Sequence, residues 1–171
     1  DPTMEMCFLT PEEITQKGYN QEYLKLLRLA DRKHLYEFMR LGTEVRPYNT
    51  LGHIAGVHYV AMYTARQLEA LKVPIDLGMV SGAAAGHDIG KYGCRQSEEK
   101  RTPYLHYYYT DICFNRFDMP MLGHIAANHS TWDLEMENLS VESLLLIYAD
   151  FRVKSVRDEY GKEHVHFYTL D

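Results

Sequence analysis

The apolar residues between about Thr50 and Leu71 recur at intervals of three and four positions, which is the spacing of one face of an α-helix. The residues on this face are Leu51, Ile54, Ala55, His58, Met62, Ala65 and Leu68. A stripe of this length predicts a helix that packs one side into a core. Because His58 interrupts the stripe, we expect its imidazole to point inward, either as a hydrogen-bonded core histidine or as a ligand.

Helix start and stop signals divide the rest of the chain. Thr10-Pro11-Glu12-Glu13 is typical of a capped helix start, and the polar stretch from Tyr92 to Thr102 predicts a loop. Further helices are predicted over Tyr23 to Leu41, Leu77 to Asp88, from Pro103, from Pro120, and from Val141 to about Asp158 after the cap Ser140. The alternation from His164 to Tyr168 is typical of an edge strand. We therefore expect an all-α bundle of about six to eight helices with a candidate short C-terminal strand.

Length and charge exclude several classes of protein. At 171 residues the chain fits a single domain, with a core over about residues 50–158 and an N-terminal helical extension over 1–46. Its ends are consistent with a segment of a longer protein. The formal net charge of −6 argues against broad nucleic-acid binding. The longest uncharged stretch, Leu77 to Gly86, is too short to span a membrane. Three widely spaced cysteines favour a reducing compartment, so we expect a cytoplasmic protein.

Polar residues that combine into a metal-ligand set stand at the ends and faces of three predicted helices. His87 and Asp88 are adjacent, and Asp150 shares a helix face with the apolar Leu146 and Ile147. A buried carboxylate needs a partner, which for Asp150 is either a metal ion or Lys154 one turn later. Together with His58, these residues offer two imidazoles and two carboxylates. That set suits a divalent transition metal with open positions for water.

The order His58, His87-Asp88, Asp150 resembles the HD-domain metal-dependent phosphohydrolases. The resemblance covers about Leu51 to Lys154, and the continuation Ile89-Gly90-Lys91 is similar to the family's His-Asp-Ile-Gly-Lys motif. It implies a helical HD-type domain with hydrolase activity on phosphorylated compounds.

Two further histidines, His106 and His129, lie where the symmetrical diadenosine tetraphosphate hydrolase branch carries ligands for a second ion. His124 is a weaker candidate, since five residues place it about 140° from His129 on a helix. Asn128 departs from the branches with two adjacent histidines at this site. Trp132-Asp133-Leu134 also replaces the Gly-Tyr-Pro signature of the cyclic-diguanylate phosphodiesterases. We expect two ions, with a mononuclear site as the alternative.

The resemblance also implies roles for individual residues. His58, His87 and Asp150 would hold one ion, His106 and His129 the other, and Asp88 would bridge them beside a water activated for attack on phosphorus. The catalytic residues would then be Asp88 and Lys91, and the substrate-binding residues Lys91, Arg152 and Lys154. Arg95, Lys100, Arg101 and one or two of Tyr107 to Tyr109 are weaker candidates for substrate contacts, because loop charges are commonly solvated and aromatic residues commonly pack in cores.

The function predicted from the sequence is metal-dependent hydrolysis of a phosphate ester or anhydride of a nucleotide or related small molecule. The expected cofactors are manganese or iron, with cobalt, nickel or magnesium as alternatives. Two other interpretations stay open: a non-catalytic, metal- or nucleotide-binding HD regulatory module of a larger protein, and a helical domain with a structural metal. Structural sites usually close all their positions with Cys and His, so the carboxylates here favour an open catalytic site.

Overall fold

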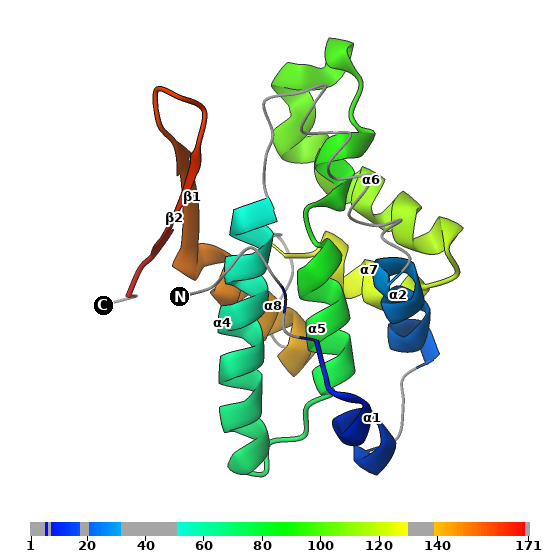
Figure 1. Cartoon of the computed structure of the whole chain (residues 1–171). Helices are drawn as coiled ribbons and strands as arrows, with labels where there is room; N and C mark the ends of the chain where they lie inside the picture. Colours follow the sequence, from blue (N-terminus) through cyan, green and yellow to red (C-terminus); the bar gives the residue numbers. More distant parts are fainter. Residues whose placement is uncertain (1–5, 7, 18–20, 32–50, 130–138, 170–171) are drawn as a thin grey trace.

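The computed structural model describes residues 6, 8–17, 21–31, 51–129 and 139–169 (Figure 1). These residues form seven α-helices: α1 (Pro11–Lys17), α2 (Gln21–Asp31), α4 (Leu51–Ala70), α5 (Leu77–Gly86), α6 (Thr102–Arg116), α7 (Pro120–Ala127) and α8 (Val141–Arg152). The remaining elements are two 3₁₀ helices, η1 (Ile89–Gly93) and η2 (Gln96–Arg101), and two strands, β1 (Val153–Arg157) and β2 (Glu163–Phe167). The predicted all-α class is confirmed.

Helix α5 lies at the centre of the bundle, between α4 on one side and α2 and α7 on the other (Figure 1). All ten of its residues are buried. Its small side chains make this position possible, because a Cβ at Gly82 would lie 2.9 Å from Leu122 and one at Gly86 would lie 2.6 Å from Phe114. The Gly- and Ala-rich composition thus lets neighbouring helices approach α5 closely.

Helix α4 has the predicted buried face. Ile54, Ala55, His58, Met62 and Ala65 are all buried, and the helix packs against α5, α8 and both strands. The short connection after α4, residues 71–76, makes α4 and α5 antiparallel neighbours. The N-terminal end of α4 therefore lies beside the C-terminal end of α5.

The predicted N-terminal cap is present. Thr10 N donates to Glu13 Oε2 at 2.8 Å, and Glu13 N donates to Thr10 Oγ1 at 3.3 Å, which is a capping box. Helix α2 is described to Asp31, so the predicted continuation to Leu41 lies outside the described residues. Residues 130–138, with Trp132-Asp133-Leu134, also lie outside them.

Two predictions of secondary structure are wrong. The predicted loop from Tyr92 to Thr102 contains the end of η1 and all of η2. The predicted helix from Val141 to Asp158 begins as expected, with Ser143 N donating to Ser140 Oγ at 3.1 Å, but it ends at Arg152. Residues Val153–Arg157, predicted as helix, form β1 instead. This strand pairs antiparallel with β2, the predicted C-terminal strand, and Val153 lies opposite Phe167. Pairing with the next strand in a hairpin therefore overrode the local helix signal.

No described helix combines the length and the hydrophobicity that a membrane span requires.

The turn after α5 is held against α6 by a close backbone approach. A Cβ at Gly90 would lie 1.9 Å from the carbonyl oxygen of His106 and 2.4 Å from the backbone nitrogen of Thr110. The Thr110 hydroxyl accepts from Gly90 N at 3.0 Å and donates to the His87 carbonyl at 3.2 Å. Gly90 thus lets η1 dock on the same turn of α6 that carries His106.

This contact predicts that Gly90→Ala lowers the free energy of unfolding by about 2 kcal/mol or more, since backbone atoms cannot move aside as a flexible side chain can. Urea denaturation followed by circular dichroism measures the loss. Gly161→Asn is the matched control, because Gly161 has φ +78° and open space around it, and asparagine tolerates that conformation. The control should change stability by less than about 0.5 kcal/mol, and equal stability of Gly90→Ala and the wild type would contradict the expectation.

Candidate metal centre

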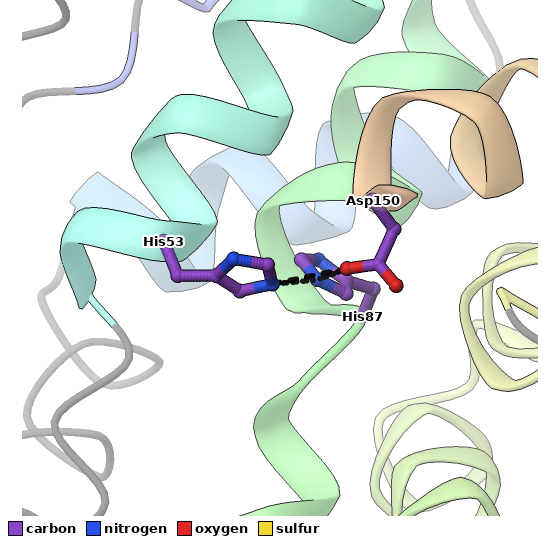
Figure 2. Close-up of side chains that lie close together, drawn as sticks. All are labelled: His53, His87 and Asp150. Carbon is purple, nitrogen blue, oxygen red and sulfur yellow. Dashed lines mark hydrogen bonds and ion pairs between the residues drawn. The ribbon is translucent and has the colours of Figure 1, made fainter. Parts of the chain in front are cut away.

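Three side chains from separate parts of the chain lie close together (Figure 2). His53 lies in the first turn of α4, His87 directly follows α5, and Asp150 lies in the last turn of α8. His53 Nε2 is 3.0 Å from Asp150 Oδ1, and His87 Nε2 lies 3.4 Å from His53 Nε2 and 3.5 Å from Asp150 Oδ1. We call His53, His87 and Asp150 the first cluster.

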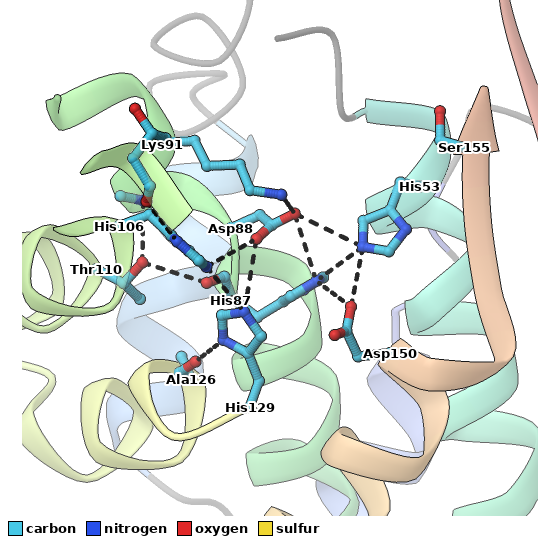
Figure 3. A network of polar contacts seen from close by, with 12 residues as sticks. His53, His87, Asp88, Lys91, His106, Thr110, Ala126, His129, Asp150 and Ser155 are labelled. Atoms are coloured by element: carbon cyan, nitrogen blue, oxygen red, sulfur yellow. Dashed lines mark hydrogen bonds and ion pairs between the residues drawn. The ribbon is translucent and has the colours of Figure 1, made fainter. Parts of the chain in front are cut away.

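A second cluster lies beside the first and consists of Asp88, His106 and His129 (Figure 3). His106 comes from α6, and His129 follows the end of α7. Asp88 Oδ1 is 3.7 Å from His106 Nε2 and 3.6 Å from His129 Nε2, and the two imidazole nitrogens are 3.2 Å apart. All three residues are buried.

Asp88 connects the two clusters through its two carboxylate oxygens. While Oδ1 faces His106 and His129, Oδ2 lies 3.6 Å from His53 Nε2 and 3.8 Å from His87 Nε2 (Figure 3). One carboxylate thus offers one oxygen to each side, which is the arrangement of a bridging ligand between two cations.

Backbone carbonyls orient three of the four histidines. The Nδ1 atoms of His87, His106 and His129 lie 2.7, 2.8 and 2.6 Å from the carbonyl oxygens of Ala84, Thr102 and Ala126. A carbonyl only accepts, so each Nδ1 carries the proton and donates it. Each Nε2 is therefore turned toward the clusters, and its lone pair is available when the imidazole is neutral, as in histidine ligands of metals.

The donor atoms fit divalent metal ions. Bonds of about 2.0–2.2 Å from a metal to nitrogen or oxygen place neighbouring ligand atoms about 3.0–3.5 Å apart in octahedral or tetrahedral geometry. The distances within both clusters, from 3.0 to 3.7 Å, lie in or close to this range. The mixture of imidazole and carboxylate without cysteine suits manganese, iron, cobalt, nickel or zinc better than magnesium or calcium.

Charges around Asp88 compensate its burial. Burial raises the pKa of this carboxyl, but the charges of Lys91 and His87 outweigh it and hold the pKa well below its usual range. Lys91 Nζ lies 2.6 Å from Asp88 Oδ2. Burial, followed by the charge of His87, lowers the pKa of His129 to about 3, and burial lowers the pKa of His106 as well. These two imidazoles are therefore neutral near pH 7, the form that binds metals.

The structure corrects one predicted ligand. His58 is buried as expected, but its Nε2 lies 2.8 Å from Ser81 Oγ on α5, and its ring packs against Phe8. Ser81 Oγ also lies 3.0 Å from the hydroxyl of Tyr23. His58 is thus a hydrogen-bonded core residue, and His53 takes the place predicted for it in the cluster.

Helix geometry explains the exchange of His58 for His53. Five residues separate the two histidines, which is about 7.5 Å along the axis and about 140° around it. His87 and Asp150 both lie at the C-terminal ends of their helices. A ligand from α4, which runs antiparallel to α5, must therefore come from its first turns. His53 is therefore identified by its position in the first turn of α4, which a search for the buried face alone does not reveal.

The other predicted site residues are divided between the clusters and the surface. His87, Asp88, His106, His129 and Asp150 are brought together, and Asp150 contacts His53 rather than Lys154. Arg152 donates to the carbonyl of Tyr168 and, at 2.5 Å, to the hydroxyl of Tyr148. Lys154 is exposed and lies over the ring of Phe151. The contacts of Arg152 and Lys154 thus lie along α8 and the strands, away from the clusters.

The weaker candidates lie on the surface or beside the second cluster. His124 is exposed on α7, with its Nδ1 3.3 Å from Asn128 Nδ2. Arg95, Lys100 and Arg101 are exposed on and next to η2. The ring of Tyr107 lies 3.9 Å from that of His106 and 4.9 Å from that of His129, between ring centroids.

Comparisons of this chain with known proteins identify no relative. No protein-family model matches the sequence, and neither the curated proteins nor the solved structures searched contain a significant match.

The environment of His58 predicts a pH dependence of stability. Burial lowers its pKa to about 4, whereas an unfolded histidine titrates near about 6.5. As the pH falls between these values, the unfolded chain takes up a proton that the folded chain does not, so folding becomes weaker. The loss between about pH 7.5 and about pH 5 amounts to about 2 kcal/mol.

His58→Gln removes this titration while keeping a polar group for Ser81. Urea denaturation of both proteins at the two pH values should show that the variant loses about 2 kcal/mol less stability than the wild type. The wild type serves as the control for every other titrating group. An identical pH dependence in the two proteins would contradict the assignment.

Proposed function

We propose that this chain is a metal-dependent phosphohydrolase that cleaves a phosphate ester or anhydride of a nucleotide or related small molecule. The observation that carries the proposal is the pair of His/Asp clusters joined by Asp88, whose oxygens face opposite sides 3.6–3.8 Å from four imidazole nitrogens. Two divalent ions bound by these residues would stabilise both the attacking and the leaving oxygen in phosphoryl transfer and lower the pKa of a nearby water.

The chain's own residues supply binding and charge. His53, His87 and Asp150 are the ligands of one ion, His106 and His129 those of the other, and Asp88 is shared. The backbone carbonyls that hold the Nδ1 atoms of His87, His106 and His129 fix these three rings in advance. This preorganisation favours a rigid site in which the ligands need little rearrangement.

Differences in exposure indicate the side from which a substrate enters. The side chains of His53, Asp150 and Lys91 are 12%, 21% and 24% exposed, whereas those of Asp88, His106 and His129 are 2%, 6% and 3% exposed. A phosphoryl group would thus approach the first cluster, next to Lys91.

Lys91 is the residue best placed to meet a phosphate. Its ammonium now neutralises Asp88, as a cation bound there would. Ions bound by Asp88 would repel the ammonium and release it toward an anionic substrate. The run His87-Asp88-Ile89-Gly90-Lys91, which is similar to the HD-domain motif, supports the same role.

The first test is metal content. Purified protein supplied with Mn²⁺ should bind about two ions per chain, and Asp88→Asn should lose both, because Asp88 is shared. His124→Ala is the matched control, since His124 is an exposed histidine on α7 and should leave both ions in place. Plasma emission spectroscopy measures the content. Wild-type protein without bound ions would exclude the proposal.

Hydrolysis is tested on a panel of nucleotides and dinucleoside polyphosphates with Mn²⁺ or Fe²⁺. Release of phosphate or nucleotide should fall by at least about a hundredfold in Asp88→Asn and stay unchanged in His124→Ala. Two bound ions without hydrolysis of any compound would instead favour the regulatory HD module.

Single substitutions test the two clusters one at a time. His53→Ala and His129→Ala should each remove about one of the two ions, since each histidine belongs to one cluster. If the site is mononuclear, His129→Ala leaves the metal content unchanged. The same emission measurement distinguishes the two cases.

A further inference from the structure

The hairpin of β1 and β2 contacts the metal centre through one carboxylate. Glu163, the first residue of β2, accepts hydrogen bonds from the backbone of α4: Gly52 N donates to Oε2 and His53 N donates to Oε1, each at 3.0 Å. His53 is itself a member of the first cluster. A residue more than a hundred positions away in sequence thus holds the backbone of a proposed ligand.

The Glu163 carboxylate is held in place from several directions. Ser155 Oγ on β1 donates to Glu163 Oε1 at 2.6 Å. A Cβ at Gly52 would lie 2.8 Å from Glu163 Oε2, and one at Gly56 would lie 2.8 Å from Val153 Cγ1. The two glycines, one turn apart on α4, form the face on which the hairpin packs, so the carboxylate reaches the helix end at close range.

The position of Glu163 also matters for charge. The N-terminus of an α-helix carries about half a positive charge, which disfavours a cation nearby. Helix α4 has no acidic residue in its first turn to offset this charge. Glu163 supplies the missing carboxylate from the hairpin, within one turn of the imidazole that would bind the ion.

We propose that Glu163 is a positioning residue of the first cluster: it fixes the backbone at His53 and offsets the charge of the α4 N-terminus, so that a divalent cation binds more tightly to His53, His87 and Asp150. This inference rests on the proposed function, since it concerns the affinity of the same metal centre. It assigns the β1–β2 hairpin a role in the site as well as in the fold.

The test uses Co²⁺, whose absorption spectrum reports its ligands, titrated into the full chain. Glu163→Gln keeps a hydrogen-bond acceptor but removes the charge. It should weaken the binding of one Co²⁺ about fivefold and change the other less than about twofold. Glu163→Ala should weaken the same ion about tenfold or more, because the capping bonds are lost as well. Glu159→Gln is the matched control, since Glu159 is exposed in the hairpin turn, and it should bind both ions as the wild type does.

A double-mutant cycle separates positioning from a general effect on folding. In the His53→Ala background, Glu163→Gln should have no further effect on Co²⁺ binding; in the His129→Ala background, it should still weaken the remaining ion about fivefold. Equal affinities of wild type and Glu163→Gln would overturn the role of Glu163 and leave the proposed function intact. Equal weakening of both ions, or weakening in the His53→Ala background, would also overturn it. A wild type that binds no Co²⁺ would overturn the proposed function as well.

Discussion

The burial of Asp88 is the constraint around which the rest of the structure is arranged. The central helix α5 is enclosed on all sides, so the residues that follow it cannot turn their polar atoms to water. A carboxylate in that position is stable only with charged or hydrogen-bonding partners. Lys91 and imidazoles from three other parts of the chain provide them. The close contact between the backbones of Gly90 and α6 brings one of these imidazoles, that of His106, near Asp88.

Most helices could be predicted from the sequence because their signals are local. The apolar stripe of α4, the Thr10 capping box and the Ser140 cap each depend on residues within one or two turns, and each is found as expected. Strand β1 could not be predicted in this way. Its residues continue a helical pattern, and only the pairing with β2 explains why the chain leaves the helix at Val153.

The candidate site was predictable in its chemistry and only partly in its members. His87, Asp88, His106, His129 and Asp150 lie together, as the resemblance to the HD-domain pattern implied. The periodicity of α4 predicted correctly that His58 is buried. A helix has buried positions along its whole length, however, and few of them lie near His87 and Asp150. The choice of His53 depends on where neighbouring helices end, and the contact with Glu163 depends on a hairpin that the sequence pattern did not reveal.

The connection between α8 and the hairpin has a consequence for the order of assembly. All three members of the second cluster are present once the chain has been synthesised to His129, whereas the first cluster requires Asp150, and Glu163 follows thirteen residues later. A chain emerging from the ribosome therefore contains all members of the enclosed cluster before it contains all members of the open one. Strands β1 and β2, the last described elements, are joined to the start of α4 by the hydrogen bonds of Glu163.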